Sequence, residues 1–187
     1  MKVVIFAGGL GTRISEETDT RPKPMVTIGG KPIIWHIMKM YSHYGFNEFI
    51  ICLGYKGYVI KEYFMNYFLH NSDLSIDIAN NKVEVHGTNS EAFKVTLLET
   101  GLETKTAGRL KQVEKYIGDE DFMLTYGDGV SDVNIEQLIK FHKTHNKIAT
   151  VTSVQLEERF GGMEVGPEGD VLSFKEKAKD EGKWINA

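Results

Sequence analysis

The sequence predicts an α/β protein built on a Rossmann-like, doubly wound sheet that is mixed but mainly parallel. Two observations support this fold class: short apolar runs alternate with segments of helical spacing, and several runs end directly in glycine. A continuous apolar run is typical of a strand that is buried in a parallel sheet. Strands that alternate with helices form βαβ units, and ligands bind outside the carboxyl ends of such strands. The glycines at the ends of the runs are therefore the first candidates for a ligand site.

The first half of the chain predicts two strand–helix units. Strands are expected at residues 3–7, 25–28 and 48–53, where apolar residues run together. A helix is expected to begin near Pro32, since a first helical turn tolerates proline, and to end at Gly45. A second helix, at residues 58–69, carries an aromatic stripe that we expect in the core: Tyr63, Phe64, Tyr67 and Phe68.

The second half continues the alternation after a β-ribbon and loop insertion at residues 71–106. Alternating runs at residues 74–78 and 82–86 predict the ribbon itself. Further strands are expected at residues 93–99, at 122–126 as a buried strand, and at 148–154. One helix is expected around Leu110, Val113 and Ile117, another after a capping box of Asn134 and Gln137, and a hairpin around residues 166–169. Without a linker or repeat, residues 1–187 are predicted to form one domain.

Composition excludes several classes of function. The 187 residues are 41% hydrophobic and 26% charged, as in an ordinary globular protein. The net charge of −4 argues against a general nucleic-acid binder, so any anion site must be local. No apolar run approaches the ~20 residues of a membrane span, and no signal-peptide core is found. The single cysteine, Cys52, excludes an internal disulfide and is interpreted as a core residue, so we expect a cytoplasmic protein without a membrane partner.

The clearest candidate site is the glycine-rich segment that follows the first strand. Gly8, Gly9 and Gly11 let the backbone approach a ligand closely, and successive free N–H groups in such a loop bind anions. The segment lacks both the G-x-G-x-x-G spacing of dinucleotide-binding folds and the Gly-Lys-Ser/Thr end of a P-loop. Arg13 and Lys23 add two cations, so the segment predicts a nucleoside triphosphate site.

Two strings in this region resemble the signature of the sugar-1-phosphate nucleotidylyltransferases. They are Gly-Gly-Leu-Gly-Thr-Arg, from Gly8 to Arg13, and Arg-Pro-Lys-Pro-Met, from Arg21 to Met25. The resemblance implies that Arg13 and Lys23 act on the triphosphate and on the charge of the transition state. The nucleotide-binding residues that it implies are Phe6, Ala7, Gly8, Gly9, Gly11, Thr12, Arg13, Lys23, Thr104, Arg109 and Gly127.

A third string, Tyr126-Gly127-Asp128-Gly129, resembles the family's metal-binding aspartate motif. The resemblance implies that Asp128 is a catalytic residue that binds Mg²⁺, an ion that takes one or two carboxylates together with substrate phosphates and water. In relatives, a second carboxylate completes this metal site from a part of the chain beyond the position of residue 187. An aspartate in a structural Gly-Asp-Gly turn is the alternative.

Thr104 and Arg109 resemble the hydroxyl-bearing residue and arginine of the family's CTP-using branch. Relatives that use uridine or thymidine triphosphate present a glutamine to the pyrimidine instead. Cytosine has acceptors at O2 and N3, whereas uracil has a donor at N3; arginine carries only donors, so Arg109 favours cytosine. A donor left unpaired against uracil costs about 1–3 kcal/mol. A solvated helix position beside Lys111 is the alternative for Arg109.

The sugar-phosphate site rests on likeness to family motifs near the end of the sequence. Glu176 and Lys177 resemble a Glu-Lys-Pro motif whose lysine binds the acceptor phosphate, although Ala178 replaces the proline. Gly161 matches a glycine that lies near the sugar in relatives, and Asn186 stands where relatives read Asn-Gly-Gly. The resemblance covers essentially all of this chain but only part of a typical family member.

Together these likenesses imply transfer of a cytidylyl group from CTP to α-D-glucose 1-phosphate, giving CDP-glucose and diphosphate. In the family this product feeds the synthesis of bacterial surface polysaccharide such as O antigen, and relatives form homo-oligomers. Three alternatives stay open: cytidylyl transfer to another phosphorylated acceptor, uridylyl or thymidylyl transfer to a sugar 1-phosphate, and nucleotide binding without turnover.

Overall fold

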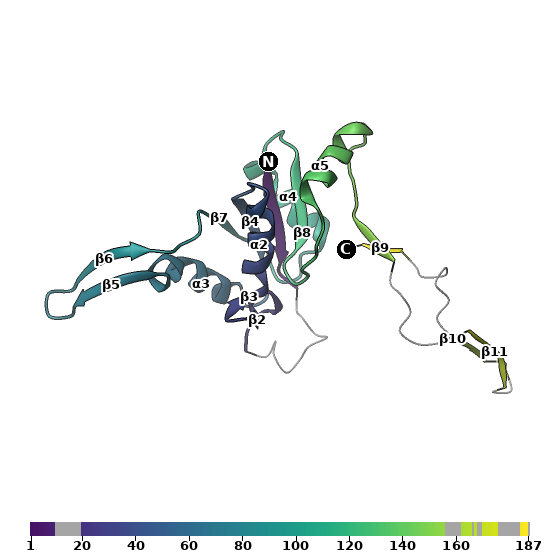
Figure 1. Cartoon of the computed structure of the whole chain (residues 1–187), viewed down its shortest axis with the longest axis horizontal. Helices are drawn as coiled ribbons and strands as arrows, with labels where there is room; N and C mark the ends of the chain where they lie inside the picture. The colour runs from purple at the N-terminus through teal and green to yellow at the C-terminus, as the bar shows by residue number, and fades with distance from the viewer. Residues whose placement is uncertain (10–19, 156–161, 166, 168–169, 176–183, 187) are drawn as a thin grey trace. The chain divides into compact units, whose positions relative to one another are not determined.

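The structure of the chain, a computed structural model, describes residues 1–9, 20–155, 162–165, 167, 170–175 and 184–186 (Figure 1). The chain divides into two compact units, Met1–Asp132 and Val133–Ala187, and each is described by itself. Six residues of the predicted site lie outside the described residues: Gly11, Thr12, Arg13, Gly161, Glu176 and Lys177.

A parallel sheet forms the centre of the first unit. Its four strands are β1 (Lys2–Ala7), β4 (Glu48–Leu53), β7 (Lys94–Glu99) and β8 (Phe122–Tyr126), in the spatial order β7-β4-β1-β8. Every neighbouring pair is parallel, and Ile5 of β1 lies opposite Ile51 of β4 and Thr125 of β8. The apolar runs of β1 and β4 are almost fully buried, as expected for central strands of a parallel sheet. The predicted fold class is confirmed.

Helices cover both faces of this sheet. Successive residues of a strand point to opposite faces, and Val4 and Phe6 pack with Val113 and Ile117 of α4 (Thr106–Ile117). On the other face lies α2 (Ile33–His43), which buries Ile34, Ile37, Met38 and Tyr41. Figure 1 shows α2 in front of the sheet and α4 behind it. The amphipathic spacing of these two helices thus gives the sheet its two apolar covers.

The connection from β1 to α2 contains three short elements. These are a 3₁₀ turn, η1 (Lys23–Met25), and a small antiparallel pair, β2 (Thr27–Ile28) with β3 (Lys31–Pro32). The strand expected at residues 25–28 is therefore shorter than predicted, because Met25 belongs to the turn. Pro32 is the residue that precedes α2, and Gly45, with φ +85°, follows the end of the helix.

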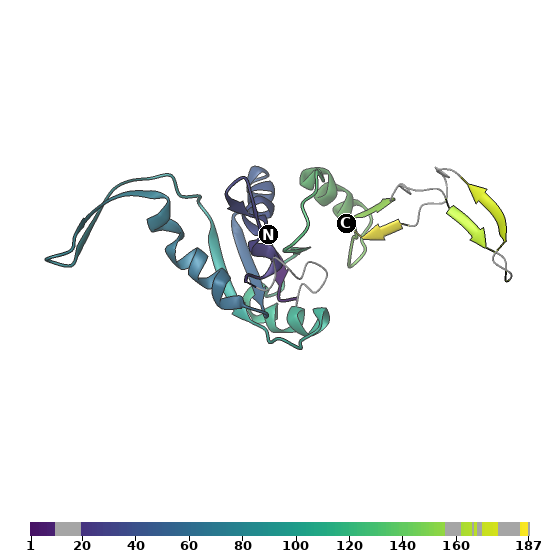
Figure 2. The same cartoon turned by 90° about the horizontal axis from the view of Figure 1, so that it is seen from below.

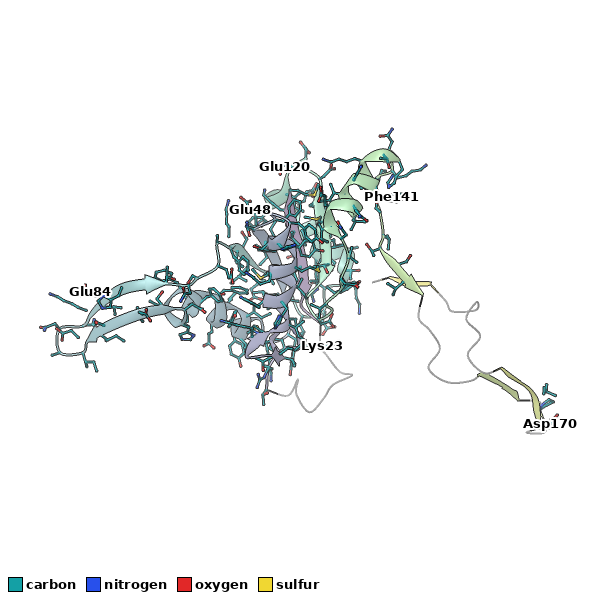
Figure 3. All side chains as sticks on the ribbon, in the orientation of Figure 1. Lys23, Glu48, Glu84, Glu120, Phe141 and Asp170 are labelled. Atoms are coloured by element: carbon teal, nitrogen blue, oxygen red, sulfur yellow. The ribbon has the colours of Figure 1, made fainter. Side chains whose placement is uncertain are left out.

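The predicted ribbon is present as β5 (Ser72–Asp77) paired antiparallel with β6 (Lys82–Thr88), after α3 (Gly57–His70). It extends away from the sheet and carries Glu84 and its neighbours into solvent (Figures 2 and 3). Within the 71–106 segment, β7 belongs to the central sheet. Of the aromatic stripe on α3, Tyr67 is buried but Phe68 is 46% exposed, so the prediction of a core position for Phe68 is wrong.

The strand at residues 122–126 has the predicted bounds but not the predicted burial. Phe122, Leu124 and Tyr126 are 37%, 46% and 48% exposed. The reason is that β8 is the last strand of the four-stranded sheet, so its side chains have fewer neighbours within the first unit. The neighbouring strand β1, which pairs on both sides, shows no such exposure.

The second unit contains α5 (Ile135–Thr144) and two antiparallel strand pairs, β9 (Ser153–Gln155) with β12 (Trp184–Asn186) and β10 (Gly162–Val165) with β11 (Val171–Lys175). The capping interaction is confirmed, since Asn134 Oδ1 accepts from the Gln137 amide at 3.0 Å. The strands on either side of residues 166–169 pair antiparallel, as the predicted hairpin requires, and most of the turn itself lies outside the described residues. The strand expected at residues 148–154 begins only at Ser153, because β12 pairs with three residues alone; Ile148 is fully exposed. None of the described helices combines the length and the apolarity that a membrane span requires.

Candidate active site

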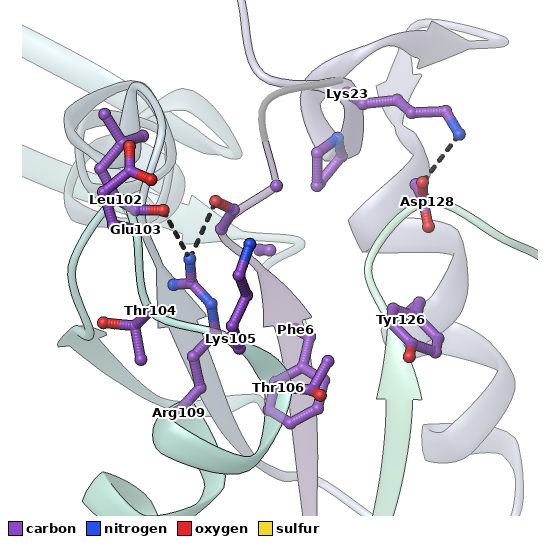
Figure 4. Close-up of a pocket in the computed structure, with 14 residues that line it drawn as sticks. Phe6, Lys23, Leu102, Glu103, Thr104, Lys105, Thr106, Arg109, Tyr126 and Asp128 are labelled. Atoms are coloured by element: carbon purple, nitrogen blue, oxygen red, sulfur yellow. Dashed lines mark hydrogen bonds and ion pairs between the residues drawn. The ribbon is translucent and has the colours of Figure 1, made fainter. Parts of the chain in front are cut away.

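A pocket of about 330 Å³ lies at the carboxyl end of the central sheet, where sequence analysis placed the site (Figure 4). Its walls come from the end of β1, from η1, from the loop that leads into α4, and from the end of β8. Parallel strands direct their carboxyl ends to one edge, which explains why segments far apart in the sequence meet here. The lining residues are Phe6, Ala7, Gly8, Gly9, Lys23, Pro24, Leu102, Glu103, Thr104, Lys105, Thr106, Arg109, Tyr126 and Asp128.

Eight of the residues predicted for the site line this one pocket: Phe6, Ala7, Gly8, Gly9, Lys23, Thr104, Arg109 and Asp128. Gly127 lies just beneath, where its amide donates to the Phe6 carbonyl at 2.9 Å. A Cβ at Gly127 would lie 3.2 Å from both that oxygen and Pro24 Cγ, so glycine suits this packed position. Asn186 belongs to β12 in the second unit, where it pairs with Ser153.

Lys23 and Asp128 form an ion pair across the pocket. Their Nζ and Oδ2 atoms lie 2.7 Å apart, and the two side chains are 28% and 37% exposed. Lys23 is the first residue of η1, and Asp128 lies two residues after the end of β8, so each side chain is positioned by an ordered element. Sequence analysis gave the two residues separate roles, one on the triphosphate and one on a metal. The structure adds that the two side chains contact each other directly.

The chemistry of Asp128 fits a divalent cation in a restricted way. In the part of the chain that the structure describes, no group of three or more His, Cys, Asp or Glu side chains could hold a metal ion. A hard cation such as Mg²⁺ does not require such a cage, because it takes one or two carboxylates and completes its shell with phosphates and water. One partly exposed carboxylate on the wall of an open pocket suits that mode of binding.

Arg109 is buried beneath the glycine-rich loop and is only 5% exposed. Its Nη1 donates to the Leu53 carbonyl at 2.8 Å and to Thr100 Oγ1 at 2.5 Å. Its Nη2 donates to the Gly8 carbonyl at 3.1 Å and to the Leu102 carbonyl at 3.3 Å (Figure 4). The alternative in which Arg109 is a solvated helix residue is therefore wrong. Its predicted contact with the base stays a prediction.

Two glycines make room for this guanidinium. A Cβ at Gly8 would collide with the guanidinium of Arg109. A Cβ at Gly54, which follows β4, would come within 2.5 Å of the Gly8 carbonyl and 3.1 Å of Arg109 Nη1. Neither glycine is among the residues with positive φ, so close packing and not backbone conformation is the reason for glycine here.

Sequence analysis missed the partners that hold Arg109. Three of its acceptors are main-chain carbonyls, which any residue type can supply, so the sequence carries no signal for them. The fourth, the hydroxyl of Thr100, also donates to the Leu53 carbonyl at 2.6 Å and is 2% exposed. A threonine directly after an apolar strand and before Gly101 was the available signal. The pocket also includes Lys105 and Tyr126, neither of which had been assigned to it.

Cys52 lies beneath the site and is fully buried. Burial raises the pKa of its thiol to about 11, an effect that the nearby Arg109 guanidinium partly offsets. A thiol with a raised pKa is a poor nucleophile at neutral pH. The interpretation of Cys52 as a core residue is confirmed.

Comparison with known proteins identifies the family. A model of the nucleotidyl transferase family matches residues 2–186. The chain belongs to the nucleotidyl transferase family. It is 57% identical over 187 residues to the glucose-1-phosphate cytidylyltransferase of Salmonella typhimurium, an alignment that spans the whole chain and 72% of that relative. It is 50% identical to the probable glucose-1-phosphate cytidylyltransferase of Bacillus subtilis, over 97% of the chain and 71% of the relative.

Solved structures of similar nucleotidyl transferases share the fold. HddC from Yersinia pseudotuberculosis, complexed with GMP-PN, aligns with a TM-score of 0.63 and 26% identity, covering 99% of this chain and 73% of that one. A putative glucose-1-phosphate thymidylyltransferase from Bacillus anthracis aligns with a TM-score of 0.66 and 18% identity, over 100% and 69% of the two chains. The second likeness supports the fold alone.

Proposed function

We propose that this nucleotidyl transferase transfers a cytidylyl group from CTP to α-D-glucose 1-phosphate, giving CDP-glucose and diphosphate. The observation that carries the proposal is the 57% identity, across the whole chain, to a relative named glucose-1-phosphate cytidylyltransferase. Relatives named for transfer of uridylyl or guanylyl groups are 26% to 31% identical. The pocket supports the proposal because it brings a glycine loop, a lysine and an aspartate together at one strand edge.

In the proposed complex, the triphosphate of CTP lies along Gly8 and Gly9 with Lys23 beside it, and the base lies toward Thr104 in the loop that leads into α4. Arg13, Gly11 and Thr12 are assigned to the same triphosphate on the strength of the family signature. The described part of the pocket supports this arrangement because Thr104 and Lys23 line different walls of it.

The proposed chemistry is an in-line displacement at the α-phosphorus. An oxygen of the sugar phosphate forms a new P–O bond there while the bond to diphosphate breaks, and no covalent enzyme intermediate is required. Lys23 and Arg13 stabilise the negative charge that develops on the phosphates. Asp128 would hold Mg²⁺, which when bound neutralises phosphate charge. The protein therefore contributes position and charge, which are the main requirements of such a transfer.

The acceptor is assigned to Gly161, Glu176, Lys177 and Asn186, with Lys177 binding the phosphate of the sugar. The support is the match of these residues to family motifs and the inclusion of residues up to 186 in the family model. We also propose a cytoplasmic homo-oligomer, because the substrates are cytoplasmic metabolites, and a role in surface polysaccharide synthesis. Light scattering of the purified chain tests the oligomer.

Steady-state release of diphosphate tests the proposal. The assay combines Mg²⁺ and glucose 1-phosphate with CTP, UTP or dTTP in turn, and repeats CTP with galactose 1-phosphate or mannose 1-phosphate. We expect release with CTP and glucose 1-phosphate that requires both substrates. Release with UTP but not CTP would contradict the base assignment, and release with another sugar phosphate alone would contradict the acceptor. Tight CTP binding without any release would contradict turnover.

A further inference from the structure

We infer that Lys105 is a further nucleotide-binding residue, whose ammonium contacts the phosphate group nearest to the nucleoside, the α-phosphate. The motifs of the sequence assign no role to this lysine. The inference deepens the proposed function and rests on it, because it takes the ligand of the pocket to be a nucleoside triphosphate whose base lies toward Thr104.

Lys105 differs from the other cations of the pocket in its contacts. Three positively charged side chains line the described pocket: Lys23, Lys105 and Arg109. Lys23 forms an ion pair with Asp128, and Arg109 donates to oxygens of the protein. Within the part of the chain that the structure describes, the Lys105 ammonium has neither an ion pair nor a hydrogen bond. An ammonium carries three donors and no acceptor, so this group can bind an anionic ligand without giving up a protein partner.

The charges around Lys105 favour an anion at this place. Lys105 directly precedes α4, and the first turn of that helix carries no acidic residue. Two carboxylates line the described pocket, Glu103 and Asp128, and neither of them pairs with Lys105. The lysine is exposed, so that a ligand can reach it from solvent. Lysine binds phosphate groups as a point charge, and the phosphates of a nucleotide are therefore the chemistry that suits this position.

The place of Lys105 in the pocket selects the α-phosphate. Thr104, toward which the base is proposed to lie, is its neighbour in the chain. Figure 4 shows the Lys105 side chain extending toward the carboxyl end of β1, whereas Lys23 lies on the other side of the pocket beside Asp128. A nucleotide whose base lies toward Thr104 and whose triphosphate extends toward Lys23 meets Lys105 between the two, at its first phosphate.

A series of ligands that differ only in their phosphates tests this assignment. Lys105→Met removes the ammonium and keeps an unbranched side chain. At a fixed Mg²⁺ concentration, we expect isothermal titration to show a loss of about tenfold in affinity for CMP, CDP and CTP alike, because each contains the α-phosphate and loses a hydrogen bond to a charged group. Cytidine, measured by its displacement of CTP, is expected to bind Lys105→Met within about twofold of its affinity for the wild type.

Two further variants separate the phosphate contact from a change in net charge or in the helix. Lys111→Met removes an equal charge from α4 at a side chain that pairs with Glu114, is 78% exposed and does not line this pocket; it is expected to bind every ligand as the wild type does. Lys105→Arg keeps a cation at the same position and is expected to bind CMP within about threefold of the wild type. In about 0.5 M NaCl the loss caused by Lys105→Met is expected to shrink, since salt screens exposed charges.

Three results for Lys105→Met would overturn the inference: unchanged affinities, an equal loss for cytidine, and a loss that is absent for CMP. The second would assign the lysine to the base or to the fold, and the third to the terminal phosphates. The same titrations with uridine, UMP, UDP and UTP separate the inference from the proposed function. A wild-type chain that binds the uridine series in place of the cytidine series would contradict the base assignment, and an equal loss for UMP, UDP and UTP would then still support the role of Lys105. A chain that binds neither series would contradict both.

Discussion

Lys23 and Asp128 illustrate how the site depends on single side chains. Their ion pair measures 2.7 Å between residues 105 positions apart in the sequence. An exposed ion pair stabilises a fold little, typically by less than about 1 kcal/mol, so a structural purpose alone does not explain it. The pair brings together the two groups that are assigned to the triphosphate and to the metal in the proposed complex.

Lys23→Met is expected to reduce kcat for CTP by about 10³-fold, because the charge on the transferring phosphate loses its lysine. The free energy of unfolding is expected to change by less than about 1 kcal/mol. Steady-state diphosphate release and urea unfolding measure the two effects. Lys31→Met, which removes an ammonium that donates to Asn71 outside the pocket, is the matched control and should retain wild-type kcat. Equal activity of the two variants would remove Lys23 from the mechanism.

Asp128→Asn is expected to raise the Mg²⁺ concentration for half-maximal activity and to lower kcat by about 10²-fold or more, because an amide is a weaker ligand than a carboxylate. Titration of activity with MgCl₂ measures both. Asp132→Asn, at an exposed position that does not line the pocket, controls for the loss of one negative charge. An unchanged Mg²⁺ requirement in Asp128→Asn would show that the metal is held elsewhere.

For single residues, the sequence predicted which side chains form the site but not the contacts that they make. The glycine loop, Lys23 and Asp128 carry a signature, and the structure brings their described members into one pocket. The hydrogen bonds from Arg109 to the carbonyls of Gly8, Leu53 and Leu102 could not be predicted, because every residue type has a main-chain carbonyl and the sequence therefore does not mark these acceptors.

Secondary-structure elements were predicted best where tertiary packing and local pattern agree. The strands at residues 48–53 and 122–126 have the expected bounds, since each is an apolar run in the parallel sheet. The strand predicted at residues 148–154 begins later than expected. Its β-branched residues favour a strand only where a partner strand pairs with them, and β12 pairs with residues 153–155 alone. The prediction that Phe122, Leu124 and Tyr126 are buried was wrong because the sequence does not reveal which strand ends the described sheet.

Asn134→Ala is expected to destabilise α5 by about 1 kcal/mol, because the Gln137 amide loses the side-chain oxygen that it donates to. Urea unfolding of the full chain, followed by far-ultraviolet circular dichroism, measures the loss. Asn134→Asp keeps an acceptor at the same place and should retain the stability of the wild type. Equal destabilisation by both substitutions would mean that the side-chain oxygen does not cap this helix.

For the whole molecule, the buried thiol of Cys52 predicts a loss of stability in alkaline solution. Burial raises its pKa from 9.0 to about 11, so the unfolded chain releases this proton at a lower pH than the folded chain. Between pH 9 and pH 11 the folded state binds more protons than the unfolded state. The free energy of unfolding therefore falls as pH rises, by up to about 1.4 kcal/mol per pH unit, and is unaffected below pH 9.

Comparison of the wild type with Cys52→Ala isolates this effect. The tyrosines whose pKa is raised by burial, Tyr41 and Tyr67 among them, titrate in both proteins and cancel in the difference. Urea unfolding at intervals from pH 8 to pH 10.5 should show the stability advantage of the wild type shrinking above pH 9. A difference that stays constant over this range would mean that the thiol titrates alike in both states.

The central claim, cytidylyl transfer to glucose 1-phosphate, is tested most directly by competition in a single reaction. The purified chain is given CTP, UTP, dTTP and GTP at equal concentration with Mg²⁺ and glucose 1-phosphate, and the nucleotide sugars are separated and identified by mass spectrometry. The account predicts CDP-glucose as the main product. A main product that carries uridine, thymidine or guanosine, or the absence of any nucleotide sugar, would contradict it.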